Sequence, residues 1–228
     1  FSTSQLPSSL CILPVHTLPS AWLLSPVCTG VESEMIRAVG RSVTFTLPST
    51  NEEAAAWSFH NHIILVLKFG NPPEASFFDH NYKTRLTFPN NGRALTISQL
   101  RINDTGLYTA QLSGQKITFT WLLHVYRELT VPTVTCMEQN CSADGCRYTL
   151  RCTASGSGSG NVSYSWRVGD LPQSEGPTVM VEEPPQDKPP LPPPPLLTCT
   201  ARNPVSSSNA TVTSPAALCA GNGHGKMR

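Results

Sequence analysis

The sequence predicts an all-β protein built of two tandem β-sandwiches, and three observations support this fold class. The chain of 228 residues is too long for one small sandwich and suits two of about 100 residues each. Short runs of alternating apolar and polar residues, separated by Gly, Pro, Asn and Asp, follow one another from residue 42 onward. Six of the eight cysteines lie from residue 136 to residue 219, and none lies from 29 to 135.

The first thirty residues contain no Lys, Arg, Asp or Glu. Their apolar run ends in small residues, which is typical of the hydrophobic region and cleavage site of a signal peptide. We expect residues 1–30 to be a leader-like or disordered segment; because a starting Met and a basic region are missing, untranslated or mis-joined sequence is the alternative. No run of 18 apolar residues occurs, so no membrane anchor is expected in the chain as given.

From residue 31 to residue 127 the sequence indicates a first sandwich. Its predicted strands are 42–47, 55–59, 63–69, 85–88, 93–100, 107–112 and 117–126. Trp57 follows the first of them by ten residues, as the buried tryptophan of an immunoglobulin sandwich does. Asp104, Gly106 and Tyr108 form the Asp-x-Gly-x-Tyr corner that leads into the penultimate strand. These features predict a variable-type immunoglobulin domain.

Two further features of this domain concern its core and its base. Ala110 stands where a cysteine is expected two residues after the corner tyrosine, and Leu47 stands at the expected partner position, so packing replaces the central disulfide. Arg85 lies nineteen residues before Asp104, a separation that would let its guanidinium bridge the carboxylate. An exposed arginine beside a turn aspartate is the alternative.

The second sandwich is expected over residues 132–220, with residues 221–228 as a tail. Its predicted strands are 146–152, 162–168, 178–183, 196–206 and 210–219. Cys152, Trp166 and Cys199 have the Cys…Trp…Cys spacing of a constant-type immunoglobulin domain. The proline-rich stretch 189–195 cannot donate ladder hydrogen bonds and is interpreted as a loop insertion of polyproline II type. A role as a ligand of cytosolic SH3 or WW modules is disfavoured, because this domain should face outward.

Charge and motifs exclude several function classes. The net charge is +1, and the sixteen Lys and Arg form no run, which argues against nucleic acid or an anionic membrane as partner. The segment 221–227 lacks the register of a phosphate-binding loop, and no nucleophile elbow is present. No carboxylates recur at metal-ligand spacing beside the four histidines of the first domain, His60, His62, His80 and His124. We therefore expect no enzyme, no cofactor and no small-molecule substrate.

The clustered cysteines indicate an oxidising, secretory compartment. Sequons for N-glycosylation support that assignment, and they begin at Asn103, Asn161, Asn209 and, more weakly because a cysteine fills its middle position, Asn140.

Several stretches together resemble the SLAM (signalling lymphocytic activation molecule) family of leukocyte surface receptors. They are "LTISQLRINDTGLYTAQ", "LHVYREL", "CRYTLRC", "VSYSW", "LTCTARNPVS" and the terminal "LC". The resemblance implies a variable-type domain without its central disulfide, followed by a constant-type domain with the bridges Cys152–Cys199 and Cys146–Cys219. It leaves Cys136 and Cys141 unassigned, either as a local bridge or as free or intermolecular thiols.

The resemblance also implies a function. The chain would be the extracellular region of an immune-cell surface receptor that binds another copy of itself, or a related receptor, on an opposing cell. A secreted form that acts as a decoy for the same ligands is the alternative. Strand alternation predicts one outward sheet face as the binding surface, with Arg93 on the opposite sheet. The residues of that face are Ser58, His60, Thr109, Gln111, Thr120, Leu122 and His124. An ordinary solvated sheet is the alternative for this face.

Overall fold

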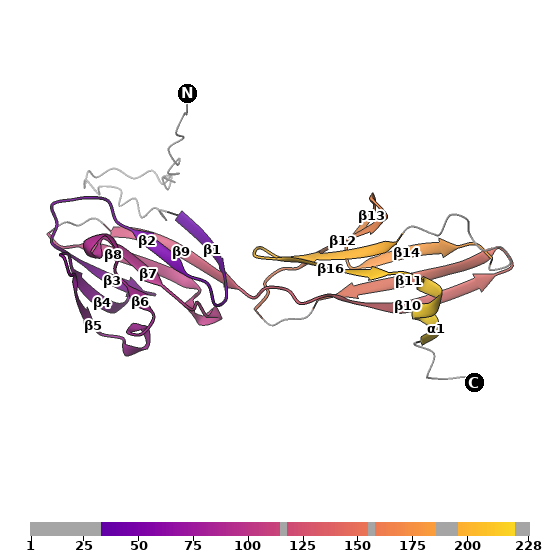
Figure 1. Cartoon of the computed structure of the whole chain (residues 1–228), viewed down its shortest axis with the longest axis horizontal. Coiled ribbons are helices and arrows are strands. Elements are labelled where there is room, and N and C mark those ends of the chain that lie inside the picture. Colours follow the sequence, from indigo (N-terminus) through magenta and orange to yellow (C-terminus); the bar gives the residue numbers. More distant parts are fainter. Residues whose placement is uncertain (1–32, 115–117, 155–157, 186–195, 222–228) are drawn as a thin grey trace, which may run out of the picture. The chain divides into compact units, whose positions relative to one another are not determined.

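The computed structural model describes residues 33–114, 118–154, 158–185 and 196–221. The expected leader 1–30 and the proline-rich insertion 189–195 lie outside these residues, as does nearly all of the expected tail 221–228. The described chain is all-β apart from short 3-10 turns and one helix (Figure 1). It separates into two compact units. The second unit begins at Val125 and also takes in the short segments Ile36–Arg41 and Gln99–Asp104.

Two sheets form the first unit. The larger has six strands in the order β1-β9-β8-β3-β4-β5, and the smaller has three in the order β2-β7-β6. The bounds of the larger sheet are β1 (Ser33–Ala38), β3 (Ala54–Phe59), β4 (His62–Lys68), β5 (Glu74–Phe77), β8 (Gly106–Leu112) and β9 (Thr118–Tyr126). Those of the smaller sheet are β2 (Val43–Thr46), β6 (Leu86–Thr87) and β7 (Ala94–Ile97). Three 3-10 turns lie between strands, at η1 (His80–Tyr82), η2 (Asn90–Gly92) and η3 (Ile102–Asp104).

Aromatic rings fill the space between these two sheets. The ring of Phe45, on β2, lies 5.0 Å from that of Tyr108 and 5.3 Å from that of Trp121, and the indoles of Trp57 and Trp121 stack at 5.4 Å. Contacts of this kind add to the free energy gained by burying the rings. Ala110 is also fully buried, and it faces Trp57 in the β3–β8 register. A packed aromatic cluster therefore occupies the middle of a sandwich that has no disulfide there.

The residue opposite this cluster on β2 differs from the one expected. Leu47 is buried, but it lies one residue past the end of β2, and the ring against Trp57 belongs to Phe45. Residues 45 and 47 are two positions apart and so point to the same face of a strand, and strand alternation alone does not distinguish between them.

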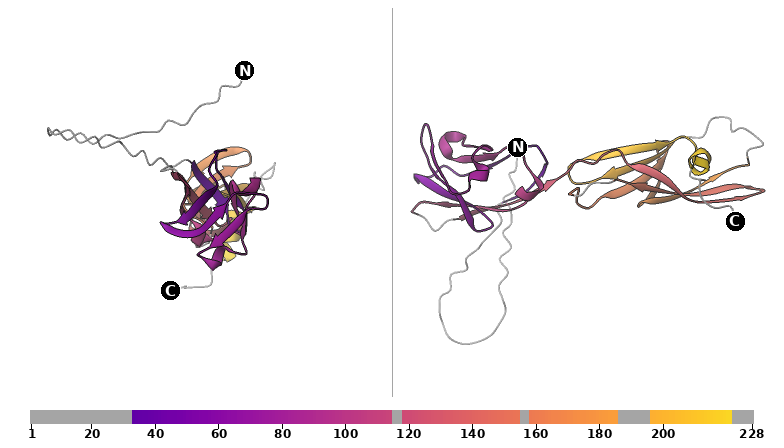
Figure 2. Two further views of the ribbon diagram at one scale, coloured as in Figure 1. Left: turned by 90° about the vertical axis from the view of Figure 1, so that its left-hand side faces the viewer. Right: turned by 90° about the horizontal axis from the view of Figure 1, so that it is seen from below.

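The second unit also contains two sheets. One has the order β10-β11-β14 and the other the order β13-β12-β15-β16, and Figure 2 shows them as two layers. Their bounds are β10 (Thr133–Ser142), β11 (Gly145–Thr153), β12 (Ser163–Val168), β13 (Leu171–Glu175), β14 (Thr178–Glu183), β15 (Leu197–Arg202) and β16 (Ser207–Val212). Trp166 is fully buried and is the register partner of Cys199. The core between the layers also includes Tyr148, Leu150 and Val179.

The last expected strand, 210–219, is wrong in its second half. β16 ends at Val212, and the helix α1 (Pro215–Gly221) follows. Ser214 accepts a hydrogen bond from the Ala217 N–H at 3.1 Å, as an N-cap residue does, and proline is favoured at the first position of a helix. The Ser-Pro pair therefore starts a helix where apolar composition predicted a continuing strand.

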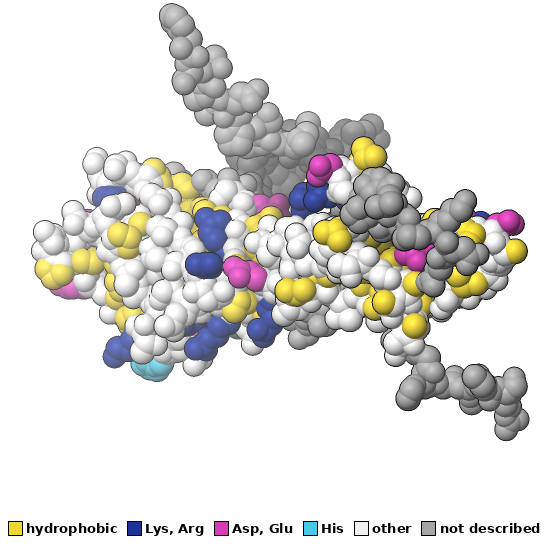
Figure 3. All heavy atoms as spheres, turned by 45° about the vertical axis from the view of Figure 1, so that its right-hand side comes forward, with side chains coloured by type: hydrophobic (Ala, Val, Ile, Leu, Met, Phe, Trp, Pro, Cys, Tyr) yellow, Lys and Arg dark blue, Asp and Glu magenta, His cyan; other side chains and the backbone are white. Residues whose placement is uncertain are grey.

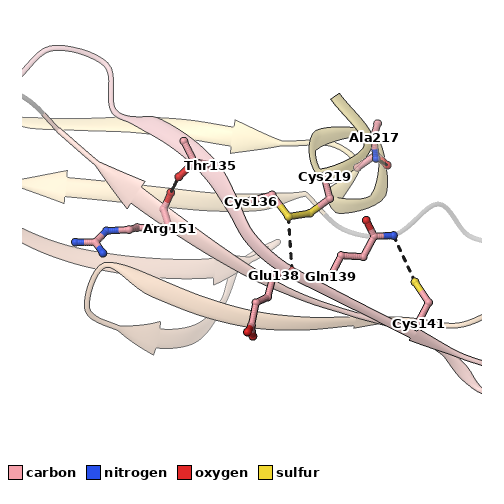
Figure 4. The surroundings of a disulfide bond; sticks show 9 residues. Thr135, Cys136, Glu138, Gln139, Cys141, Arg151, Ala217 and Cys219 are labelled. Carbon is pink, nitrogen blue, oxygen red and sulfur yellow. Dashed lines mark hydrogen bonds between the residues drawn. A yellow bond between two sulfur atoms is a disulfide. The ribbon is translucent and has the colours of Figure 1, made fainter. Parts of the chain in front are cut away.

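The disulfides of the second unit correct one expected pairing. Cys152 is joined to Cys199, but Cys146 is joined to Cys141 and Cys219 to Cys136. The expected Cys146–Cys219 bridge is therefore absent. Cys141 and Cys146 are register partners in the β10–β11 hairpin. The helix α1 lies against β10 and brings Cys219 next to Cys136 (Figure 4).

A buried asparagine organises the start of the second unit. Asn203, 7% exposed, donates from Nδ2 to the carbonyl oxygens of Arg127 at 2.7 Å and Ser159 at 2.9 Å. Its Oδ1 accepts from the backbone N–H groups of Val205 and Ser206 and from the Ser206 hydroxyl. One side chain thus joins three segments of this unit that are distant in sequence.

Candidate recognition surface

The outward face of the six-stranded sheet carries most of the residues expected to bind a partner. Alternation along β3, β8 and β9 buries Trp57, Tyr108 and Trp121 and turns their neighbours outward. Ser58 faces Thr109 across one pair of strands, and Thr109 faces Thr120 across the next. Gln111 is exposed on β8, while Leu122 is half-buried beside Leu107 on the same face.

A shallow hollow lies in this face where the side chains are small. Its volume is about 240 Å³, and its lining comes from β3, β4 and the end of β8. The lining residues are Ala54, Ala55, Ala56, Val66, Gln111, Leu112 and Ser113. Ala54 and Ala56 are the sequence signal that could have located this feature, because both lie on the outward face of β3 and small side chains leave room above the sheet. They were not among the residues expected on this face.

Strand alternation was expected to place His60 on this face, but β3 ends at Phe59 and His60 follows it. It lies with Asn61 in the two-residue turn that joins β3 to β4, where both residues have positive φ, 46° and 67°. A two-residue hairpin turn of this type requires positive φ at both positions, which asparagine tolerates well. The His60 ring packs at 4.2 Å from that of Phe59, over Gly106 at the start of β8. Phe59 itself is half-buried.

Charged side chains occupy the two sides of the sheet. On the β4–β5 side, Lys68 and Glu74 are register partners. On the other side, His124 Nε2 of β9 lies 2.9 Å from Glu34 Oε1 of β1. Between them, the outward residues of β3 and β8 carry no formal charge. Ile63, on β4, is 50% exposed on this same face opposite Ser58, and adds an apolar contribution that the sequence analysis did not include.

The predicted glycosylation sites do not belong to the strands at the centre of this face. Asn103 is exposed in η3, Asn161 in the loop before β12, Asn209 on β16 and Asn140 on β10. None of these positions is on the outward residues of β3, β4, β8 or β9.

The predicted structural residues are buried. Trp57, Tyr108 and Trp166 have no exposed surface, and Arg85 and Asp104 are about 5% exposed. Asp104 Oδ2 accepts the Arg101 N–H at 2.7 Å, and the Arg85 guanidinium lies 5.3 Å from the centre of the Tyr82 ring. A bridge between Arg85 and Asp104 stays a prediction, supported by the need of buried charges for partners.

Within the described part of the chain, no group of three His, Cys, Asp or Glu side chains is placed to hold a metal ion. Among the same residues no helix has the length and hydropathy to cross a bilayer. The view in Figure 3 shows apolar side chains scattered in small groups among polar atoms, with charges of both signs between them.

Comparison with known proteins connects this geometry to a family. No protein-family model matches the chain. It is 30% identical over 182 residues to SLAM family member 5 of Mus musculus, covering 77% of this chain and 52% of that protein. It is 26% identical over 224 residues to SLAM family member 7 of Homo sapiens, covering 94% of this chain and 64% of that protein. The chain thus spans between half and two thirds of these relatives, and the resemblance predicted from its motifs is confirmed.

Solved structures show the same fold. The CD2-binding domain of CD58 aligns with a TM-score of 0.56 at 18% identity, over 80% of this chain and 96% of that one. Murine CEACAM1b aligns with a TM-score of 0.57 at 16% identity, over 78% and 94%. The fold is therefore immunoglobulin-like. The SLAM family relatives are non-enzymatic receptors, in agreement with the expectation that this chain is not an enzyme.

Proposed function

We propose that this chain, whose relatives are SLAM family receptors, is the extracellular recognition region of an immune-cell surface receptor. In this proposal the outward face of the six-stranded sheet binds the same face of a second copy, or of a related receptor, on an opposing cell. The domains are a variable-type domain over 31–127 and a constant-type domain over 132–220. Support for that order comes from the β4 and β5 strands, which extend the large sheet of the first unit as the extra strands of variable domains do.

The observation that carries the binding proposal is the distribution of charge on the face. Its centre consists of Ala, Ser, Thr and Gln side chains of β3 and β8, and charged residues lie towards both sides. Interfaces between proteins have the same arrangement, with few charges in the centre and a polar rim. A patch of this kind can meet its own copy across a two-fold axis without burying an unpaired charge.

Two features favour an interface over a solvated sheet. The hollow beside Ala54 and Ala56 offers space for a partner side chain, and anchors in such pockets contribute most to binding energy. The partly exposed Ile63 and Leu122 supply apolar area elsewhere on the same face. A weak contact of roughly 800 Å² per partner suits a surface of this mixed composition.

Self-association and bead aggregation would test the proposal. Gln111→Arg and Leu122→Asp place a charge on the face, where a two-fold contact would bring it near its own copy, and we expect affinity to fall by at least about tenfold. Thr46→Arg and Thr87→Asp are matched controls, because both threonines are exposed on strands of the smaller sheet. If the face variants are folded and aggregate as well as the wild type, the proposal that this face binds a partner is refuted. Loss of aggregation in the control variants alone would place the binding surface on the smaller sheet.

A further inference from the structure

One of the three disulfides in the described part of the second unit lies at the protein surface. The side chains of Cys152 and Cys199 have no exposed area, and Cys219 is 7% exposed within the same core. Cys141, in contrast, is exposed near the tip of the β10–β11 hairpin, and its partner Cys146 is half-buried.

The bridge between Cys141 and Cys146 also lines an open hollow of about 430 Å³. The other lining residues are Asn140, Ser142, Asp144, Gly145, Arg147, Glu182 and Glu183. A thiolate can exchange with a disulfide only if it can approach one of the sulfur atoms, so access decides which bridge reacts. The hollow gives a reductant this access. Its lining is mostly hydrophilic, so a folded partner protein can reach the bridge without displacing core residues.

Opening this bridge leaves the fold supported by other interactions. It closes a separation of 5 residues, whereas the other bridges close 47 and 83, and the stabilisation from a disulfide grows with loop length. The two strands that it joins are held in register from Thr133↔Thr153 to Ser142↔Gly145. The hairpin therefore keeps its shape through backbone pairing when the sulfur–sulfur bond is absent.

We propose that Cys141–Cys146 is a reversible thiol-exchange site that a dithiol oxidoreductase opens in the folded protein. One thiolate of the reductant attacks Sγ of Cys141, forming a mixed disulfide and releasing Cys146 as a thiolate that takes a proton from water. The second thiolate of the reductant then attacks the reductant's own sulfur in the mixed disulfide and releases Cys141. The protein gains two electrons and two protons, and the dithiol becomes a disulfide.

Differential alkylation under native conditions tests this site. The oxidised protein is treated with a small thioredoxin-type dithiol protein, labelled, and mapped by mass spectrometry. Cys141 and Cys146 should be labelled at least about tenfold faster than the other four cysteines of the second unit. Equal rates for the three bridges, or faster opening of Cys136–Cys219, would overturn the proposal, as would a starting protein in which Cys146 is joined to Cys219.

Two further measurements separate exchange from unfolding. A reductant whose second cysteine is replaced by serine should be trapped as a mixed disulfide on Cys141, and trapping on Cys152 or Cys199 would contradict the assignment. The double variant Cys141→Ser, Cys146→Ser should remain folded, with its melting temperature within a few degrees of the wild type. The matched variant Cys152→Ala, Cys199→Ala should lose far more stability. If the two variants lose equal stability, the surface bridge is structural and the proposal fails.

Discussion

Replacing Asn203 by alanine should destabilise the second unit by about 3–4 kcal/mol. The substitution removes two donated and three accepted hydrogen bonds, and each contributes about 0.5–1.5 kcal/mol net. Simple addition gives about 5 kcal/mol at 1 kcal/mol each, and water that reaches the exposed partners recovers part of it. The side chain is 7% exposed, so this recovery is incomplete.

Thermal unfolding followed by calorimetry measures this effect. For a unit of this size, 1 kcal/mol shifts the melting temperature by about 4–8 °C, so the second unit's transition should fall by more than about 10 °C. Hydrogen exchange supplies a local check, because the amide protons of Val205 and Ser206 lose their Asn203 acceptor and should exchange faster. Asn51→Ala, at an exposed position of the first unit, is the control and should change neither quantity.

Asn203→Asp tests the two donated bonds separately. Aspartate keeps oxygen acceptors for Val205 and Ser206 but presents a carboxylate oxygen to the carbonyl groups of Arg127 and Ser159. We expect a loss comparable to that of the alanine variant. A loss below about 1 kcal/mol for Asn203→Ala, or wild-type stability for Asn203→Asp, would refute the reasoning, since each bond would then contribute less than the usual range.

Three other predictions address the core, the pH dependence and the glycans. Phe45→Ala should cost about 3–5 kcal/mol in a urea titration, because it empties the centre of the aromatic cluster; a cost below 1 kcal/mol would mean that the sheets close around the gap. Burial raises the pKa of Glu183, and the hydrogen bond from Tyr148 only partly offsets this. The folded protein therefore binds the proton of this carboxyl group more tightly than the unfolded chain does. The free energy of unfolding declines as the pH rises above the pKa of Glu183 in the unfolded chain. Glu183→Gln should therefore stabilise the unit at neutral pH and lose that advantage in acid, and an equal effect at both pH values would contradict the sign. Peptide mapping of protein secreted from mammalian cells should find glycans at Asn103, Asn161 and Asn209. Glycan occupancy should be lower at Asn140, because its sequon contains the bridged Cys141. Full occupancy of Asn140 together with an intact bridge would contradict this expectation.

Local patterns in the sequence predicted the interior of the first unit well. The period-two pattern of residues 107–112 puts Tyr108, Ala110 and Leu112 on one face of the strand, and all three are buried. Such a pattern is sufficient because one face of each strand meets the opposite sheet, so a shift by one residue would expose the whole apolar set.

The disulfide pairing could not be taken from family spacing. Cys141 and Cys146 flank "SADG", and an Asp-Gly pair between strand-like runs is a strong hairpin signal. A hairpin there would bring the two cysteines near each other, but Asp144 and Gly145 as its two central residues would pair Cys141 with Tyr148. In the structure the turn residues are Ala143 and Asp144, and Cys141 pairs with Cys146. The pairing of Cys219 with Cys136 depends on where α1 lies against β10, a tertiary fact without a local signal.

Arg93 shows a second limit of sequence reasoning. It was expected as an ordinary residue of the opposite sheet, but its guanidinium donates to the carbonyl oxygens of Thr50 and Glu52 at 2.6 and 3.2 Å. It also lies 4.6 Å from the centre of the Phe69 ring. Thr50 and Glu52 are 43 and 41 residues away in sequence and, like Phe69, belong to loops, so no periodicity indicates these partners. A charge reversal at Arg93 would therefore disturb the fold and is unsuitable as a surface control.

The missing central disulfide and the binding face are connected through the strands that serve both. β8 contributes Tyr108 and Ala110 to the core, while Thr109 and Gln111 of the same strand point outward. Alternate side chains of a strand are attached to the same backbone. The packing around Phe45 therefore fixes the positions of the outward residues without a covalent bridge. Phe45→Ala should consequently lower both stability and aggregation, whereas Gln111→Arg should lower aggregation alone. If Phe45→Ala reduced stability by the expected amount and left aggregation unchanged at a temperature where the protein is folded, the face would not depend on this core.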